Sequence, residues 1–323
     1  MNIVLHGAVA RLGFDALLQH FGDGVALNVT DLGDSDATHA QFASADVLIT
    51  IGFDKSLPPT PHLKLIHLPS SGLDEIDFSV VPDGCRVCNA FEHAIGISEY
   101  VLAAMLHWII DLPGRNQRFK AGDWADTPRL GAPFRRELAA QTIGCIGYGT
   151  IGQAIVTRAS AFGARILAVT RNPRPLQPPP AWLGSFAELD TLLQQSDFVV
   201  IACPLDDTTR GLIGAEQFSR MLPHAVLINV ARGPIVDQDA LFKTLRDHRI
   251  GGAVLDTWYR YPTPDTPTIQ PAAHPFHELD NVLMTPHCSG WTDGLIPRRF
   301  ATIIDNIERL RAGQPLINQV HPA

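Results

Sequence analysis

Three polar residues follow separate apolar runs in the second half of the chain. Arg232 lies two residues beyond AVLINV, Asp256 closes IGGAVLD, and His287 lies two residues beyond NVLMT. Because ligands of an open α/β sheet bind outside the carboxyl ends of its strands, we expect these side chains to converge on one crevice. A guanidinium there can bind a carboxylate and polarise a carbonyl, and an imidazole can donate a proton.

A glycine-rich turn supplies a second half for such a site. Residues 143–155 read IGCIGYGTIGQAI, which places Gly147, Gly149 and Gly152 in a GxGxxG spacing between an apolar run and a helical pattern. In a dinucleotide-binding turn the first glycine makes the tight turn, the second admits the pyrophosphate and the third allows helix packing. A lone GxGxxG is weak, and a tight turn without a ligand is the alternative. Beside a nicotinamide, the cation, carboxylate and imidazole suit reduction of a 2-oxo acid.

The choice of cofactor depends on the end of the next strand-like run. ARILAVT ends in Thr170 and continues into Arg171, with Arg174 close behind, where an NAD-binding strand ends in an acid. A guanidinium binds the 2′-phosphate of NADP, which an acid would repel. The sequence therefore favours NADPH over NADH. The alternative is that Arg171 is a solvated loop cation that stacks on adenine.

The elements that position these residues alternate between β and α patterns. Residues 1–95 contain the runs NIVLHG, ADVLITIG and LKLIHLPSSG, and six more runs follow from Gln141 onward. This rhythm predicts an α/β fold with two doubly wound parallel-sheet domains. A long helical pattern from about residue 95 to 118 and a Gly- and Pro-containing connector separate them, and a helix over about 293–313 with an extended tail ends the chain.

Composition excludes several classes of function. A chain of 323 residues with a formal charge of -8 and no basic run predicts two domains and gives no footprint for nucleic acid or an anionic membrane. Five scattered cysteines favour reduced thiols in the cytoplasm, and MNIVLHGAVARLG favours a first strand over a signal peptide. Cys85 and Cys88 form a lone CxxC, which favours core thiols over zinc or redox use. No metal site is predicted.

Several segments resemble the signature segments of the NAD(P)-dependent D-2-hydroxyacid dehydrogenase family, which includes glyoxylate and hydroxypyruvate reductases. They are NVARGPIVDQDAL, GGAVLDTW and NVLMTPHCSG, with SSGLDEID and SEYVLAAML in the first half. The resemblance covers nearly the whole chain. It implies a Rossmann cofactor domain, residues 96–290, inserted into a flavodoxin-like substrate domain of residues 1–95 plus 291–323, and a homodimer built on the cofactor domains.

The resemblance also implies roles by position. Arg232 becomes the substrate-binding arginine, His287 the acid/base, and Ser71 and Gly72 donors of backbone amides to the substrate carboxylate. Glu92 and His93 would fall in the loop that faces the cleft from the substrate domain, with a solvated loop as the alternative. Asp256 would lie near the nicotinamide. The implied cofactor groove also includes Gly147, Tyr148, Gly149, Thr150, Ile151, Gly152, Thr170, Arg171, Arg174, Pro204, Asn229, Ala231 and Gly290.

One expected carboxylate is missing. In the family, the strand ending in LD is followed by a Glu-Pro whose Glu charges the catalytic histidine, and here Tyr261 precedes Pro262. Without that carboxylate we expect His287 to titrate near the ordinary imidazole value of about 6.5. In one interpretation Tyr261 is a third catalytic residue whose hydroxyl accepts a hydrogen bond from the imidazole and fixes its tautomer, so that reduction is confined to lower pH. In another, an acid such as Asp265, Glu278 or Glu92 takes the place of the missing glutamate.

A third interpretation is a nucleotide-sensing protein, similar to corepressors of this fold, with little or no dehydrogenase activity. The presence of both Arg232 and His287 favours the enzyme.

Substrate identity stays open among glyoxylate, hydroxypyruvate and larger 2-oxo acids. Trp124 and Trp291 are candidates to enclose an apolar substituent, with core packing as the alternative. The last helix carries two arginines, Arg298 and Arg299, that either reach a second carboxylate or lie on the helix surface.

Overall fold

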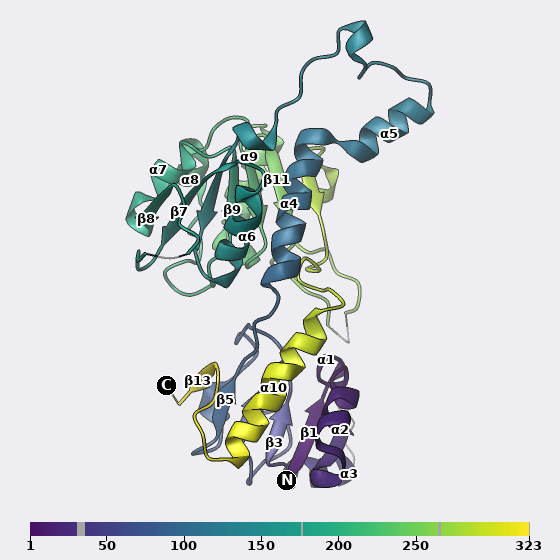
Figure 1. Ribbon diagram of the computed structural model, residues 1–323, viewed down its shortest axis with the longest axis vertical. Helices are drawn as coiled ribbons and strands as arrows, with labels where there is room; N and C mark the ends of the chain where they lie inside the picture. Colours follow the sequence, from purple (N-terminus) through teal and green to yellow (C-terminus); the bar gives the residue numbers. More distant parts are fainter. Residues whose placement is uncertain (31–35, 176, 264–265, 323) are drawn as a thin grey trace. The chain divides into compact units, whose positions relative to one another are not determined.

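The computed structural model describes residues 1–30, 36–175, 177–263 and 266–322 (Figure 1). The chain divides into two compact units, one formed by Met1–Glu92 with the chain from Thr292 onward and the other by His93–Trp291. The boundaries expected from the sequence lay after residue 95 and before residue 291. Each unit is built on its own sheet, as predicted for a fold with two parallel-sheet α/β domains.

The first unit contains a six-stranded sheet in the order β13-β5-β4-β3-β1-β2, parallel throughout except for β13, which pairs antiparallel with β5. This is the flavodoxin-like order with an added antiparallel edge. The predicted last helix is α10, and the predicted extended tail is β13. The elements of this unit are β1 (Asn2–His6), α1 (Ala8–Arg11), α2 (Phe14–Phe21), β2 (Ala26–Thr30), α3 (Asp36–Ala43), β3 (Val47–Ile49), β4 (Leu65–His67), β5 (Arg86–Cys88), α10 (Leu295–Arg311) and β13 (Gln319–His321).

Both faces of this sheet are covered, because successive residues of its strands enter different hydrophobic clusters. Ile3 packs with Phe300 of α10, whereas Val4 packs with Phe42 of α3. The CxxC cysteines are divided in the same way, with Cys88 in the first cluster and Cys85 in the second. Burial raises the pKa of each of these thiols to about 12. They are core residues with protonated thiols, as the sequence favoured.

The second unit contains a seven-stranded parallel sheet in the order β12-β11-β10-β9-β6-β7-β8. All six runs expected here form strands, and the seventh strand, β8, adds one edge. Helices α4 and α6 pack on one face and α7, α8 and α9 on the other. The elements are α4 (Ala94–Ile110), α5 (Leu112–Lys120), β6 (Thr142–Ile146), α6 (Thr150–Ser160), β7 (Arg165–Thr170), β8 (Trp182–Ser185), α7 (Leu189–Leu193), β9 (Phe198–Ile201), α8 (Ala215–Arg220), β10 (Val226–Asn229), α9 (Gln238–Arg246), β11 (Gly252–Leu255) and β12 (Val282–Met284).

The long helical pattern predicted near residues 95–118 is two helices, not one. Asp111 takes the left-handed conformation with φ 51, which ends α4, and its side chain accepts a hydrogen bond from Gly114 N, which begins α5. Pro113 at the start of α5 suits this position, where its missing N–H costs no helical bond. In the described part of the chain no single helix could cross a membrane. Only the pair α4 and α5, bent by 44°, has the length and composition together.

Candidate active site

The glycine-rich turn joins β6 to α6 and leaves room above the helix N-terminus. Gly147 has φ 101, and a Cβ there would lie 2.6 Å from Cys203 N. A Cβ on Gly152 would lie 2.5 Å from Gly147 O, so both positions require glycine. A Cβ on Gly149 would meet nothing within 4 Å. Gly149 and Thr150 are exposed, so the first turn of α6 faces open space that suits an anionic pyrophosphate.

Two predicted cofactor-binding residues near this turn differ in exposure, because Tyr148 is buried and Arg174 is exposed. Tyr148 is 3% exposed, its hydroxyl donates to Pro178 O, and burial raises its pKa to about 12. Its side chain therefore fixes the glycine turn to the proline-rich loop, and only its backbone remains for a ligand. Arg174 lines an open pocket of about 430 Å³ in that loop. The other lining residues are Pro173, Pro175, Gln177, Pro179, Pro180 and Leu183.

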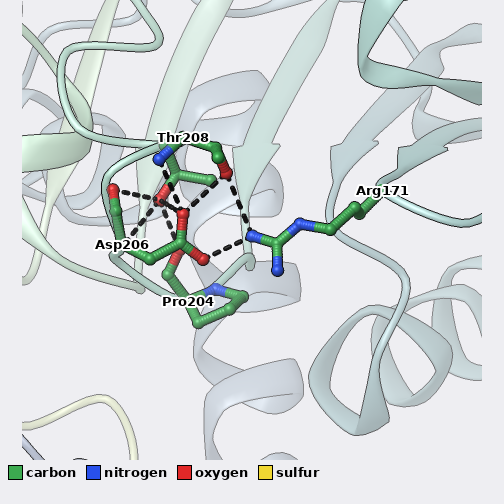
Figure 2. Close-up of polar contacts among 5 residues, drawn as sticks. Arg171, Pro204, Asp206 and Thr208 are labelled. Carbon is green, nitrogen blue, oxygen red and sulfur yellow. Dashed lines mark hydrogen bonds and ion pairs between the residues drawn. The ribbon is translucent and has the colours of Figure 1, made fainter.

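Arg171 extends from the end of β7 toward the loop that follows β9. Figure 2 shows its guanidinium directed at Asp206, with which it forms an ion pair, and at Thr208, whose Oγ1 lies 3.0 Å from Nη2. The Thr208 hydroxyl and then the Arg171 guanidinium hold the pKa of the Asp206 carboxyl well below its usual range. Thr170, at the end of β7, is half-buried, and Pro204, after β9, is exposed. Between these two strand ends lies the ion pair of Arg171 and Asp206.

Arg232 lies in a turn that Asn229 organises at the end of β10. Asn229 is 1% exposed, donates to Arg232 O at 2.9 Å and accepts from Ala231 N at 3.1 Å. The next residue, Gly233, packs so closely that a Cβ would lie 2.4 Å from Trp258 O. The loops after β10 and β11 therefore touch, and the Arg232 side chain, half-buried, starts from this junction.

His287 lies on a turn that the Asp256 carboxylate holds together. Asp256 is fully buried, and its two oxygens accept from Thr285 Oγ1 at 2.6 Å, Cys288 N at 2.9 Å and Ser289 N at 2.9 Å. Within this turn His287 takes the left-handed conformation with φ 57, which is rare for a non-glycine residue. The contact of Asp256 with a nicotinamide stays a prediction, because the bonds recorded for its side chain all lie within the His287 turn.

A partly buried pair of hydroxyls, from Tyr100 and Thr285, extends this arrangement to α4. Tyr100 Oη lies 2.7 Å from Thr285 Oγ1. Because the Thr285 proton is directed to Asp256, Tyr100 is the donor in this bond. Burial raises the pKa of Tyr100 to about 12, so the donor keeps its proton. Sequence reasoning missed both residues, because the two positions are 185 residues apart and nothing in their local spacing links them.

Tyr261 lies beside the imidazole of His287, with ring centroids 5.5 Å apart and planes inclined by 52°. Its hydroxyl accepts from Trp258 N at 3.1 Å. Trp258 in turn donates its indole N–H to Thr285 O at 2.8 Å. The segment after β11 thus connects the Arg232 loop to the His287 turn, and the structure brings Arg232, Tyr261 and His287 to one end of three adjacent strands.

The three acids proposed to replace the missing carboxylate lie in different parts of the chain. Asp265 lies outside the described residues. Glu278 has a side chain that is 70% exposed and lies 4.0 Å from His277. Glu92 belongs to the other unit and has φ 55. Its carboxylate lies 3.8 Å from Arg298 Nε, and its carbonyl accepts from Arg298 Nη2.

Arg299 differs from the expectation of a surface cation or a substrate-reaching group. It is 8% exposed and donates to Phe91 O at 3.2 Å, and burial lowers its pKa to about 10. The reason is that its position on α10 faces the loop before Glu92.

His93 is the N-cap residue of α4 and lies against Gly290, on which a Cβ would be 3.3 Å from His93 Cβ.

Ser71 and Gly72 form a loop after β4 in the first unit. Asn89 is 3% exposed and donates to Ser71 O at 3.0 Å, and Ala90 N donates to Ser70 O at 3.0 Å. The second polar atom of the side chain, Asn89 Oδ1, is buried without a hydrogen-bond partner among the described residues. Through the bond to Ser71 O, Asn89 holds this loop to the end of β5.

Two tryptophans proposed to enclose a substituent are both exposed. Trp124 is 57% exposed and meets Phe119 edge to face, and Trp291 is 56% exposed. Neither is a core residue. In the described part of the chain, no group of three or more His, Cys, Asp or Glu residues is placed to hold a metal ion.

Comparisons with known proteins identify the family. The sequence model for the NAD binding domain of D-isomer specific 2-hydroxyacid dehydrogenases matches residues 102–289. The glyoxylate reductase of Thermococcus gammatolerans is 39% identical over 322 residues, covering 97% of this chain and 93% of that protein. The chain therefore belongs to the D-isomer specific 2-hydroxyacid dehydrogenase family, and it is an NAD(P)-dependent oxidoreductase of this class.

Two solved structures of the family match the whole chain. The D-isomer specific 2-hydroxyacid dehydrogenase from Xanthobacter autotrophicus Py2, in complex with NADPH and MES, has a TM-score of 0.77 and 27% identity, with 99% of this chain and 98% of that chain covered. D-lactate dehydrogenase from Lactobacillus jensenii with NAD+ has a TM-score of 0.77 and 26% identity, with 99% of each chain covered. The two differ in the cofactor that they hold.

Proposed function

We propose that this enzyme reduces a small 2-oxo acid to the D-2-hydroxy acid. The observation that carries the proposal is the arrangement of Arg232 and His287 at the ends of two strands, β10 and β12, that flank β11. A guanidinium and an imidazole at neighbouring strand ends suit the binding of a 2-oxo acid and the delivery of a proton to its ketone oxygen. The resemblance to a glyoxylate reductase supports glyoxylate as the first substrate to test.

Arg232 and His287 have different roles in this reaction. Arg232 binds the substrate carboxylate and stabilises the charge that develops on the ketone oxygen. His287, protonated, donates its proton to that oxygen, and the strained turn at φ 57 fixes the direction of the imidazole. The reduced nicotinamide supplies the hydride. The open space above Gly149 and the exposed start of α6 fit its pyrophosphate.

We infer that NADPH is the preferred cofactor, because Arg171 and Arg174 stand where an NAD-binding strand carries an acid. The NADPH held by the Xanthobacter relative supports this choice, and the NAD+ held by the Lactobacillus relative keeps NADH as the comparison. Arg171→Ala should weaken NADPH binding much more than NADH binding. An equal loss for both cofactors would mean that Arg171 only stacks on adenine.

Activity with both cofactors tests the reaction itself. NADPH and NADH oxidation would be followed with glyoxylate, hydroxypyruvate, pyruvate and phenylpyruvate between about pH 5 and pH 8, the range over which imidazole titrates. Turnover that declines as pH rises supports His287 as the proton donor. Tight cofactor binding with no turnover of any 2-oxo acid would instead favour a nucleotide-sensing protein, for which the replacement of Glu by Tyr261 is the specific reason.

We also propose a homodimer formed through the segment that follows α4. Figure 1 shows α5 and the chain after it standing away from the sheet of their own unit. Arg115 and Arg118 both pair with Asp126, which fixes the shape of the segment. Its large apolar side chains are exposed nonetheless, which marks an association surface. They are Leu112, Phe119, Trp124, Leu130 and Phe134.

The oligomeric state tests this surface. Phe134→Asp should convert a dimer to a monomer in light scattering at micromolar concentration, because a charge would be buried against the partner. Phe162→Asp is the matched control, since Phe162 is 43% exposed and lies outside the segment.

All five cysteines are free, and four are buried, which supports our placement of the enzyme in the reducing cytoplasm.

A further inference from the structure

Asp206 adds a determinant of cofactor choice that lies outside the glycine turn and the β7 strand end. Its carboxylate pairs with Arg171, which also donates to Thr208 Oγ1 (Figure 2). We propose that Asp206 is a built-in counter-ion that holds Arg171 and competes with the 2′-phosphate of NADPH for the guanidinium. The inference rests on the proposed function, in which Arg171 binds that phosphate.

The carboxylate is the fixed member of the pair. Asp206 Oδ1 accepts from Thr208 N at 2.9 Å and from Thr208 Oγ1 at 2.6 Å. Thr209, fully buried, accepts from Asp206 N at 2.8 Å and donates to Pro204 O at 2.7 Å. These bonds hold the Asp206 turn to the end of β9. When a 2′-phosphate arrives, the flexible Arg171 side chain is therefore the member of the pair that shifts toward it, while the carboxylate stays in place.

The competition follows from charge. The Thr208 hydroxyl and Arg171 together keep the pKa of Asp206 well below its usual range, so this carboxylate is ionised across the working pH of an enzyme. A phosphate dianion bound to Arg171 would lie near this fixed negative charge, and like charges at short range oppose each other. NADH carries no 2′-phosphate and meets no such opposition. Asp206 therefore lowers affinity for NADPH and leaves affinity for NADH unchanged.

The expected effect is moderate, because the pair is partly solvated. The side chains of Arg171 and Asp206 are 52% and 36% exposed, and exposed ion pairs are weak. A phosphate offers Arg171 stronger charge-assisted bonds than one carboxylate does. Asp206 should therefore narrow a preference for NADPH without reversing it. Removing its charge should tighten the binding of a 2′-phosphate by about 1.4-fold to fivefold.

Asp206→Asn is the informative substitution, because the amide oxygen can still accept the two bonds from Thr208. The dissociation constants of adenosine 2′,5′-bisphosphate and AMP, which differ only in the 2′-phosphate, would be measured by titration calorimetry on the full chain. We expect tighter binding of the bisphosphate and unchanged binding of AMP. Asp207→Asn is the matched control, since it removes the same charge from the next residue, an exposed one, and should have a smaller effect.

A double-mutant cycle with Arg171→Ala separates this inference from the proposed function. If Arg171→Ala abolishes the preference for the bisphosphate and the gain from Asp206→Asn disappears in that background, Asp206 acts through Arg171 as proposed. A gain that persists without Arg171, a gain equal to that of Asp207→Asn, or weaker binding by Asp206→Asn would overturn the counter-ion role. If Arg171→Ala leaves the preference intact, the NADPH proposal itself fails.

Discussion

The centroids of the Tyr261 ring and the His287 imidazole are 5.5 Å apart. Tyr261 occupies the position where the family carries a glutamate. Its hydroxyl accepts a hydrogen bond from Trp258 N, so the tyrosine is held by the backbone of its own loop. This arrangement retains a side chain that packs against the imidazole. It exchanges a full negative charge for a neutral, aromatic neighbour, which changes the electrostatics of the proton donor.

Tyr261→Glu should extend reduction to higher pH. A carboxylate near His287 favours the imidazolium and raises its pKa, typically by about one to three units at close range. Reduction needs that proton, so activity falls as pH rises through the imidazole pKa, and the fall should move upward in the variant. We expect the lower end of the range, because Tyr261 is 42% exposed and water screens the pair.

The pH profile of kcat for 2-oxo acid reduction is the measurement. Tyr261→Gln is the matched control, since it has the shape of glutamate without its charge and should keep the wild-type profile. A profile that is the same in all three proteins would remove Tyr261 from the proton-donating apparatus.

Much of the fold could be predicted because strand ends and glycine spacing are local features. The six runs of the second unit form strands, and Arg232 and His287 lie where those runs end. The strand β8 was missed because it is a short edge strand, half-buried over most of its length, after a proline-rich loop. The helix break at Asp111 depends on one left-handed residue, which the composition of an apolar run conceals.

Much of the support around the site could not be predicted, because it consists of hydrogen bonds between distant residues. The sequence placed Asp256 at a strand end, but its three donors come from a turn about thirty positions later, with separations such as 32 to Cys288. Arg171 was predicted to bind the 2′-phosphate of NADPH. Its ion-pair partner Asp206 was not predicted, because it lies 35 positions further along the chain. The order of strands in the folded sheet decides which loops become neighbours, so these contacts cannot be recognised from local sequence.

Thr285→Val should lower kcat with little change in cofactor affinity. The change preserves shape but removes the hydroxyl that joins Tyr100 to Asp256, at 2.7 Å and 2.6 Å. The His287 turn would lose one of its three bonds to Asp256, and the imidazole would be less well directed. A loss on the order of tenfold in kcat is expected, since small misplacements of a catalytic group are costly.

Thr285→Ser tests whether the hydroxyl is responsible. It restores the bonding group and should recover most of the activity, whereas Tyr100→Phe should give an intermediate loss. The dissociation constant of the cofactor, from fluorescence titration, should stay within about twofold throughout. Equal losses in Thr285→Val and Thr285→Ser would point to packing and away from a positioning role.

Asn89→Ala should raise KM for the 2-oxo acid more than it lowers kcat. Asn89 donates to Ser71 O at 3.0 Å, and the loop of Ser71 and Gly72 is predicted to bind the substrate carboxylate through its amides. Without this bond the loop is less ordered, so binding weakens by up to about tenfold, the cost of a lost hydrogen bond to an ordered group. Steady-state kinetics with the cofactor saturating would measure this. A rise in KM for the cofactor instead would contradict a role confined to the substrate loop.

His67 should make the enzyme less stable in mild acid. Its ring is fully buried, Nε2 accepts from Asn306 Nδ2 at 2.9 Å, and the ring proton on Nδ1 points to Leu68 O. Burial lowers its pKa to about 4, because the charged ring cannot be solvated there. Protonation would also place two donors face to face at Asn306.

The direction of the pH effect follows from linkage. In the unfolded chain the ring takes up a proton near its ordinary value of about 6.5, whereas in the folded chain it does so only near pH 4. The unfolded state therefore binds more protons between these values, and the free energy of unfolding falls as pH decreases through this window, by roughly 2 kcal/mol at about pH 5. Thermal unfolding of wild type and His67→Gln at pH 7 and pH 5 measures it. The variant lacks the titrating group, so its loss on acidification should be smaller; an equal loss in both proteins would assign the acid sensitivity to other residues.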